Sequence, residues 1–503
     1  MKKLSMFAEK QFVFITSIFV ACFVIVYGYL YSSKLSEVSG NIMSYVSETF
    51  GWLYVAAVFF FIVFLAWLAF GRYGNIRLGK NDESPQYSTF SWFAMLFCGS
   101  TGIGLVFWSI AEPLSHFVSP AYGMQAGTED TMEWSIRTVF LHWGITQWAC
   151  FAVVGLGLAY FQHRKGKTGQ ISNLLTPLVG EKATNGFFGK LVDVFSVVVS
   201  FAGVATSLGL GCTQICGGLN YLFGIPNNKR IWLWVIVVIT CVFLASAISG
   251  VDKGIKLLSS INTYLALALL AIAFLVGPKI RILDTLVNGM GQHIQNMVAD
   301  VLMINATGDR TWIMNWRVFY YAWFIAWTPF VGLFIAVISK GRTIKEFILG
   351  VVAAPSLFTI VWLSVFGTIA FDATEGYSLQ EIARLVASPE TAVFIVFEKY
   401  PLARLMSLMV ISLLAIFFIT SADSATYSLG MMTSDGNLNP PKYKKVVWAI
   451  VEAAIAYILL SAGSLKPLQT ASIAASLPFL FIMIAMCPAL LKELKKEMVD
   501  THK

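Results

Sequence analysis

Aromatic side chains crowd one short stretch of the sequence, residues 316–332, which reads WRVFYYAWFIAWTPFVG. A helix that only fills space does so more simply with Leu and Val. Ring faces are both apolar and electron-rich, so a row of them offers a binding surface for a diffuse cation. In a helix, four rings at spacings of four, three and four residues share one stripe: Trp316, Tyr320, Trp323 and Trp327.

A second aromatic group precedes it in the motif HWGITQW, residues 142–148. Trp143, Trp148 and Phe151 fall within an arc of about 140° if the segment is one continuous helix at 100° per residue. Tyr321 and Phe324 flank the first stripe. Two such arcs facing one another would form an aromatic box.

Two further stretches carry backbone and hydroxyl chemistry. The stretch SWFAMLFCGSTGIGLVFW has Gly99, Gly102 and Gly104 at its middle. Each glycine weakens a helix by about 1 kcal/mol, and irregular backbone at membrane depth survives only where it lines a cavity or is covered by protein. The stretch FFITSADSATYS, residues 417–428, adds a run of hydroxyls and Asp423, which are unfavourable in lipid and should face inward. Close helix packing would explain the glycines alone; together the two stretches favour an ion site at a broken helix.

The composition indicates the kind of structure that must hold these residues in place. The chain has 503 residues, 57% of them hydrophobic and only 12% charged, whereas a soluble domain has about 25% charged residues. Apolar runs of about 20 residues recur along the chain, each long enough to cross a bilayer as a helix. The sequence therefore predicts an all-α polytopic membrane protein. Twelve spans are predicted, at 11–32, 51–71, 89–117, 134–161, 190–222, 231–250, 256–277, 314–338, 346–371, 402–432, 445–462 and 468–490.

A thirteenth segment, 284–303, is shorter and more polar, and its apolar residues keep helical spacing. It is predicted to lie along the membrane interface. Lys and Arg concentrate in the connectors that a layout with both termini inside assigns to the cytoplasm. The net charge of +8 is spread over these connectors, which argues against a nucleic-acid surface.

Cysteines and histidines give no sign of a metal or catalytic centre. The seven cysteines lie in or beside apolar runs, and the chain has only five histidines. Cys212 and Cys216 share a helix face but have no histidine partner in sequence. Because no nucleophile–base pair stands at a suitable spacing either, we expect neither an enzyme nor a bound cofactor.

Four motifs together resemble the betaine/choline/carnitine transporter family: AEPLSHF, HWGITQW, YAWFIAWTPFVGLFIAVISKGRT and FFITSADS. The resemblance covers nearly the whole chain. It implies a LeuT-like core of five plus five helices in inverted repeat, preceded by two extra helices. The expected parts are the tail and two peripheral helices at 1–88, the first repeat at 89–283, the interfacial helix and linker at 284–313, the second repeat at 314–490 and a short basic tail at 491–503. It also implies a multi-pass protein of the cytoplasmic membrane and a homotrimer formed through 284–303.

The family's substrates carry a quaternary ammonium group, which has no N–H to donate and is suited to ring faces. By resemblance, the substrate pathway is lined by Trp143, Trp148, Phe151, Tyr321, Trp323, Phe324 and Trp327. The family often has Tyr at the position of Phe151 and Trp at that of Phe324. The Phe side chains at these two positions imply a site that binds the cation more weakly or has more room.

The resemblance also bears on the charge of the substrate. Choline carriers of the family tend to have an acid where Gly104 stands here, so the substrate should bring its own negative charge, as betaines and carnitine do. Its carboxylate would bind backbone N–H groups around Ser100, Gly102 and Gly104. Glu112 lies about 12 Å further along a helix and is assigned a structural role.

Sodium is the expected coupling ion. Sodium-coupled members of the family resemble this chain at a hydroxyl pair that carbonyls would complete, which here gives Cys98, Thr101, Phe417, Thr420 and Ser421. Asp423, Asn262 and Ser200 are supporting residues. The family's sodium-independent exchangers have Arg and Met where Asn262 and Val331 stand. We therefore expect sodium-coupled uptake of a betaine-like zwitterion, with substrate–product exchange, for instance carnitine against γ-butyrobetaine, as the alternative.

Overall fold

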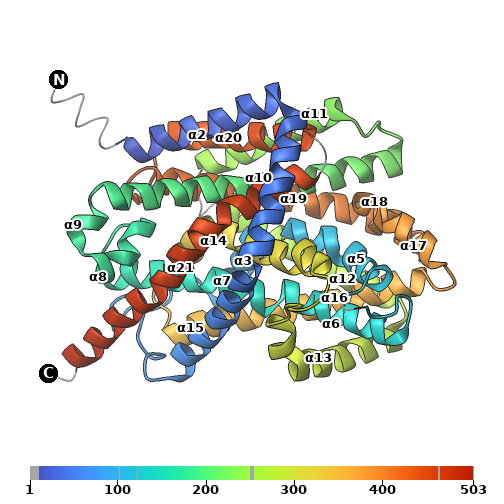
Figure 1. The fold of residues 1–503 in the computed structure, drawn as a ribbon, viewed down its shortest axis with the longest axis horizontal. Coiled ribbons are helices and arrows are strands. Elements are labelled where there is room, and N and C mark those ends of the chain that lie inside the picture. The colour runs from blue at the N-terminus through green and yellow to red at the C-terminus, as the bar shows by residue number, and fades with distance from the viewer. Residues whose placement is uncertain (1–10, 101, 122, 250–253, 463–464, 502–503) are drawn as a thin grey trace.

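The structure is a computed structural model that describes residues 11–100, 102–121, 123–249, 254–462 and 465–501 (Figure 1). These residues are almost entirely helical, and their one β-bridge joins Arg77 to Thr343. The main helices are α2 (Phe12–Leu30), α3 (Ser32–Phe70), α4 (Thr89–Ser100), α5 (Gly102–Val118), α6 (Glu129–Trp143), α7 (Ile145–Ala159), α10 (Phe187–Phe223), α11 (Lys229–Ser249), α12 (Gly254–Val276), α13 (Lys279–Val301), α14 (Phe319–Ile338), α15 (Ile344–Ile348), α16 (Ala354–Ala373), α17 (Leu379–Val386), α18 (Pro389–Phe397), α19 (Ala403–Met432), α20 (Lys442–Ser461) and α21 (Leu465–Thr501).

The all-helical, polytopic architecture is confirmed. Within the described ranges, nine helices are long and apolar enough to cross a membrane, and the bent pair α4–α5 brings the number to ten. These match ten of the twelve predicted spans. The other two predicted spans, 231–250 and 445–462, correspond to the helices α11 and α20 and are not among these ten. Twelve crossings, the inverted repeat and the domain boundaries stay predictions.

The glycine-rich stretch is interrupted, as its composition predicts. The bend lies between Phe97 and Gly102, where the segments Thr89–Phe97 and Gly102–Val118 meet at 62°. Gly102 sits directly against α19, because a Cβ on Gly102 would lie 1.8 Å from the ring of Phe417. The first turn of α5 is therefore in direct contact with α19, the hydroxyl-rich helix. Thr101 lies outside the described residues.

A second interruption was not predicted. The expected continuous span 134–161 is divided at Gly144, which separates α6 from α7. A Cβ at Gly144 would lie 2.4 Å from the carbonyl oxygen of Phe140, so the backbone there takes a path that a larger residue would obstruct. The hydroxyl of Thr146 donates to the Leu141 carbonyl at 2.6 Å and satisfies an acceptor that the break leaves open. The arc drawn for Trp143, Trp148 and Phe151 assumed a continuous helix and was wrong in that respect.

The connectors predicted to be cytoplasmic meet on one side of the molecule. The Leu78 backbone N–H donates to the Arg342 carbonyl at 2.7 Å. Arg164 donates to the Gly79 carbonyl at 2.7 Å and pairs with Glu497 at 2.6 Å. An ion pair of Lys340 with Glu83 at 2.6 Å lowers the pKa of the Glu83 carboxyl.

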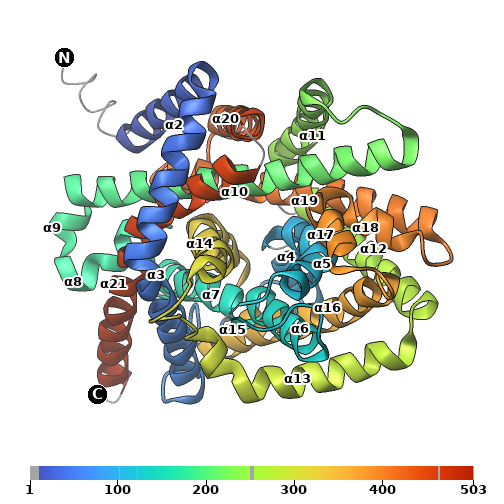
Figure 2. The same cartoon turned by 45° about the vertical axis from the view of Figure 1, so that its right-hand side comes forward.

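Helix α13 runs along the periphery of the helix bundle (Figure 2). It begins five residues before the predicted interfacial segment 284–303, at Lys279, and ends two residues before the end of that segment, at Val301. Polar contacts fasten it to α6: Arg137 pairs with Asp300 at 2.7 Å, and Asn288 donates to Glu133 at 2.9 Å. Its role in a trimer stays a prediction.

The seat of Gly102 on Phe417 gives a test of the α5–α19 contact. We expect Gly102→Ala to destabilise the folded protein by about 1–3 kcal/mol, because the new methyl group must push the ring aside. Gly291→Ala is the matched control, since a Cβ at this exposed α13 position meets nothing within 4 Å. The melting temperature in detergent should fall for the first variant and stay level or rise for the second. Equal melting temperatures would contradict the contact.

Candidate functional site

Two aromatic surfaces meet where α7 packs against α14, the most extensive helix–helix contact among the described elements. Phe151 of α7 lies nearly parallel to Trp327 of α14, with ring centroids 6.4 Å apart and planes 19° from parallel. Phe151 also meets Phe324 edge to face, at 6.4 Å and 77°. Each of these rings is at most 5% exposed. The facing arrangement of the two groups therefore exists, and it is closed to solvent.

Trp143 adds a third wall from the end of α6. Its ring stands nearly perpendicular to that of Trp323, at 6.0 Å and 87°, and lies 6.1 Å from that of Phe324. A Cβ on Gly104 would lie 2.6 Å from the Trp143 ring and 3.0 Å from the Trp323 ring. The rings thus close directly on the α5 backbone, just beyond the break. We call Trp143, Phe151, Trp323, Phe324 and Trp327 the aromatic box.

Trp148 and Tyr321 lie next to the box. The ring of Trp148 packs edge to face on Phe151, with centroids 5.8 Å apart. Tyr321 is buried on α14. Trp316, by contrast, sits in a π-helical turn at Ile313–Val318 and packs on His116 at 4.5 Å. Trp316, the first ring of the predicted stripe, therefore packs in a neighbouring cluster around His116 and lies outside the box.

The polar atoms of these rings divide into two groups. The Trp327 indole N–H donates to the Gly203 carbonyl at 2.9 Å, and the Trp143 N–H donates to Glu112 at 2.7 Å. The indole nitrogens of Trp148 and Trp323 and the hydroxyl of Tyr321 are buried and have no partner among the described residues. A buried donor without a partner is unfavourable, so a bound ligand that accepts hydrogen bonds would be stabilised there.

The predicted sodium residues lie together only in part. The hydroxyl of Thr420 donates to the Phe417 carbonyl at 3.2 Å. The Ser421 hydroxyl is buried without a partner among the described residues. Phe417 itself touches the broken helix at Gly102. Thr101 and the side chains of Cys98 and Ser100 fall outside what the structure describes.

The three supporting residues are scattered over three helices. Asp423 is buried on α19 and interacts electrostatically with Lys445. Asn262 is buried on α12, and its amide atoms have no partner among the described residues. The hydroxyl of Ser200 donates within its own helix, to the Ser196 carbonyl at 2.7 Å.

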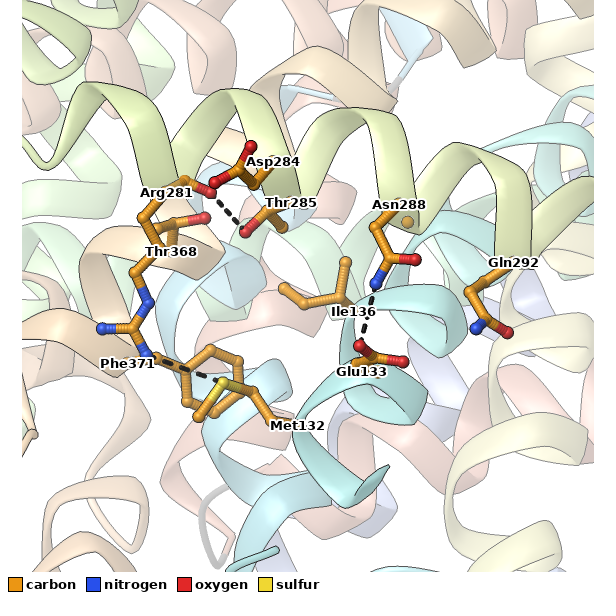
Figure 3. A pocket seen from close by; sticks show the side chains of 11 residues that line it. Met132, Glu133, Ile136, Arg281, Asp284, Thr285, Asn288, Gln292, Thr368 and Phe371 are labelled. Atoms are coloured by element: carbon orange, nitrogen blue, oxygen red, sulfur yellow. Dashed lines mark hydrogen bonds between the residues drawn. The ribbon is translucent and has the colours of Figure 1, made fainter. Parts of the chain in front are cut away.

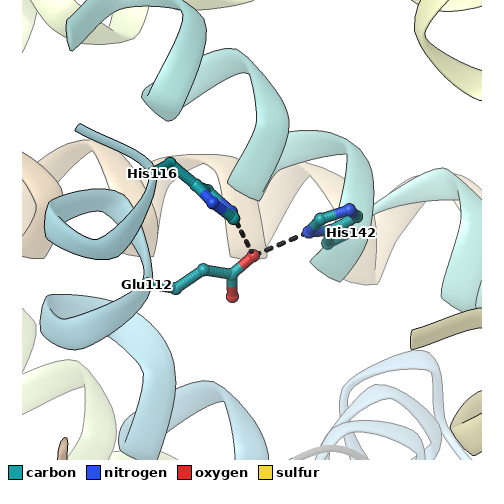
Figure 4. A group of neighbouring side chains, drawn as sticks. All are labelled: Glu112, His116 and His142. Atoms are coloured by element: carbon teal, nitrogen blue, oxygen red, sulfur yellow. Dashed lines mark hydrogen bonds and ion pairs between the residues drawn. The ribbon is translucent and has the colours of Figure 1, made fainter. Parts of the chain in front are cut away.

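Glu112, His116 and His142 form a buried cluster that was not predicted from the sequence (Figure 4). The cluster adjoins the box through Trp143. One oxygen of Glu112 accepts hydrogen bonds from His142 at 2.7 Å and from His116 at 3.2 Å. The other accepts from Trp143 at 2.7 Å and from Tyr320 at 2.6 Å. Glu112 and His116 are four residues apart, a helical spacing, but His142 is 30 residues from the acid, so no sequence spacing indicated the complete cluster.

This group of one acid and two histidines has the residue types of a metal site. The lone pairs of Glu112 and His142, however, are taken, and only Nδ1 of His116 has no partner among the described residues. Both oxygens of Glu112 accept two donors each, and the remaining ring nitrogen of His142 accepts from Arg317 at 3.1 Å. A cation would have to displace these donors and stand beside a guanidinium. The cluster is therefore a hydrogen-bonding centre.

A separate cavity of about 210 Å³ opens between α6, α13 and α16 (Figure 3). Arg281, Asn288 and Glu133 line it, together with Phe371 and Met132. None of its lining residues belongs to the aromatic box. A ligand in this cavity would contact α13 and would not reach the rings.

Comparison with known proteins shows the family of the chain. The family model of the betaine/carnitine/choline family transporters matches residues 12–499. The glycine betaine transporter OpuD of Bacillus subtilis (strain 168) is 44% identical over 481 residues, which is 95% of this chain and 93% of that protein. The ectoine/hydroxyectoine transporter of Virgibacillus pantothenticus is 39% identical over 96% of each chain. A glycine betaine transporter of Acinetobacter baylyi is 37% identical over 96% of this chain and 73% of that protein.

The described part of the chain is helical with at least nine potential membrane spans, and the family match assigns the chain to the membrane transporters. The chain is a member of the betaine/carnitine/choline transporter family.

The box gives a prediction for its central indoles. Trp323→Leu and Trp327→Leu should each raise the KM for a trimethylammonium substrate by about 2- to 30-fold, because each ring contact contributes about 0.5–2 kcal/mol. Trp362→Leu removes an equally buried indole on α16, bonded to Ser109 and outside the box. Initial uptake rates per folded molecule measure the effect. A KM that responds equally to all three changes would contradict the assignment.

Proposed function

We propose that the protein is a secondary active transporter that couples sodium entry to uptake of a quaternary ammonium zwitterion across the cytoplasmic membrane. Glycine betaine, or a related betaine or carnitine, is the proposed substrate. The observation that carries the proposal is the closed box of rings from α6, α7 and α14 against the α5 backbone at Gly104. Relatives that are named glycine betaine and ectoine transporters support it.

The box suits the cationic end of such a substrate. A trimethylammonium group spreads its charge over methyl groups and has no N–H to donate, so carbonyls and hydroxyls cannot hold it by hydrogen bonds. Perpendicular and parallel rings around one space present faces and edges that match a round, apolar cation. The exclusion of water from the box strengthens each contact.

Two observations favour a zwitterion over choline. The buried indole N–H groups of Trp148 and Trp323 offer hydrogen bonds to a carboxylate. Gly104, where choline carriers of the family tend to have an acid, leaves no room for a side chain, since a Cβ there would lie 2.6 Å from the Trp143 ring. A zwitterion that brings its own carboxylate needs no protein acid at that position.

Sodium is proposed to bind between the α4–α5 break and α19. The contact of Phe417 with Gly102 and the unpartnered hydroxyl of Ser421 support this position. Each charge that moves down a potential of about 100 mV supplies about 2.3 kcal/mol, enough for roughly 40-fold accumulation per sodium ion. The alternative, sodium-independent exchange, has less support because the neutral amide of Asn262 stands where exchangers of the family have arginine.

The same proposal places both termini in the cytoplasm and α13 at the subunit contact of a homotrimer. The convergence of the basic connectors near Leu78, Arg164 and Arg342 supports a common side for them. Lipid would surround the remaining apolar surface.

The coupling ion can be tested in proteoliposomes. We expect uptake of labelled glycine betaine with an inward sodium gradient and little uptake with potassium in its place. Ser421→Ala should raise the sodium concentration for half-maximal uptake about tenfold or more, since it removes one ligand of the proposed site. Uptake that needs internal substrate and ignores sodium would establish exchange instead.

A second measurement separates the two ends of the substrate. Trp323→Phe keeps an aromatic face but removes the unpartnered N–H. It should weaken glycine betaine binding about tenfold beyond any loss for choline, because only the zwitterion has an acceptor for that donor. Titration followed by tryptophan fluorescence measures both ligands. Equal losses would show that the indole N–H does not meet the carboxylate.

A further inference from the structure

Glu112 connects the aromatic box to the interior of the protein. It is fully buried on α5, in a bundle otherwise dominated by apolar contacts. Four donors converge on its two carboxylate oxygens, and two of these donors, Trp143 and Tyr320, are rings at the box. Trp143 belongs to the box, and Tyr320 packs against three of its rings, so the contacts of Glu112 reach the box as well as α5.

The indole of Trp143 lies lengthwise along α5. Its Nε1 atom lies 2.7 Å from Oε2 of Glu112. At the opposite end of the ring, Cη2 is the atom nearest to a Cβ placed on Gly104. Glu112 therefore acts on the box through this ring, although the carboxylate itself is too far along the helix to touch a ligand beside Gly104.

Tyr320 carries the same influence to α14. Its hydroxyl donates to the Glu112 oxygen that Trp143 also uses. Its ring meets Trp143 at 5.4 Å, Trp323 at 5.9 Å and Phe324 at 5.6 Å. One carboxylate oxygen thus fixes a ring at the end of α6 and a ring on α14, two helices that both contribute rings to the box.

The negative charge of Glu112 is balanced by Arg317, which is connected to the carboxylate through His142. His142 donates to Glu112 from Nδ1 and accepts from Arg317 at Nε2, an arrangement that requires a neutral imidazole. Arg317 in turn donates to the Asp300 carbonyl, and the Asp300 carboxylate pairs with Arg137. The carboxylate can stay ionised in the core, and its negative charge lies directly behind Trp143.

We propose that Glu112 is the positioning residue of the quaternary ammonium site, an inference that rests on the proposed function. Its carboxylate sets the orientation of Trp143 and Tyr320, and its charge makes the box electronegative. The substrate's cationic group therefore binds to rings that the buried Glu112 carboxylate keeps in position.

Glu112→Gln separates this role from simple packing. The amide has one accepting oxygen in place of two, so whichever way it turns, one pair of donors loses its acceptor. The Tyr320 hydroxyl can turn and accept from the amide, but the Trp143 N–H cannot. We expect glycine betaine affinity to fall about tenfold or more, since a buried donor is left unpaired. Glu112→Asp keeps both oxygens and should restore part of the affinity.

Asp193→Asn is the matched control. Asp193 is a buried carboxylate on α10 that accepts hydrogen bonds from Ser172 and Gln170, and none of its recorded partners is a ring of the box. We expect this acid-to-amide change to leave glycine betaine affinity at the wild-type level.

The experiment measures binding of glycine betaine and of 3,3-dimethylbutanoate, its isostere with carbon in place of the ammonium nitrogen, to purified full-length protein. Glu112→Gln should lower the ratio of the two affinities, because the loss of negative charge weakens only the cationic ligand. A merely structural defect would weaken both ligands equally and leave the ratio unchanged, which would overturn the inference. If Glu112→Gln does not fold, Tyr320→Phe removes one donor and leaves the charge. The affinity for both ligands should then fall with their ratio unchanged, and a wild-type affinity for both would overturn the positioning role.

The wild-type titration separates this inference from the function beneath it. A wild-type protein that binds no glycine betaine overturns the proposed function and the inference with it. Wild-type binding together with an unchanged affinity ratio in the variant overturns the inference alone.

Discussion

A cation without hydrogen-bond donors is held well inside a membrane by surfaces that are apolar and electron-rich at once. Rings satisfy both conditions, and in this protein they face one another across the contact of α7 with α14. The surrounding structure keeps those rings apart from lipid and water. The rest of the proposed mechanism depends on this contact, because without it a trimethylammonium group would lose its hydration and gain nothing.

Irregular backbone gathers around the rings. The α4–α5 break puts Gly104 under the rings of Trp143 and Trp323. The division at Gly144 ends α6 at Trp143, and Gly203 lets α10 approach Trp327 closely enough to accept its indole N–H. Breaks and close approaches in helices are a common way to line a site at membrane depth. The same break meets Phe417 of α19, so an ion bound there would sense the position of the helix that carries Gly104.

What could be predicted from the sequence followed local rules. The stripe of Tyr320, Trp323 and Trp327 has helical spacing, and the clustered glycines near Gly102 are strong local breakers, so the aromatic face and the α4–α5 break were predicted. The division at Gly144 was missed because a single glycine without proline is a weak signal. The hydrogen bonds that converge on Glu112 were not predicted because its partners lie up to 208 residues away, and only the packed helices bring them together.

The central claim is that the substrate's quaternary nitrogen lies among these rings. The most direct measurement is a structure determined with arsenobetaine, in which arsenic replaces that nitrogen and can be located by its anomalous scattering. The account predicts an arsenic peak enclosed by Trp143, Phe151, Trp323 and Trp327, beside Gly104. A peak in the cavity between α6, α13 and α16, away from the rings, would contradict it.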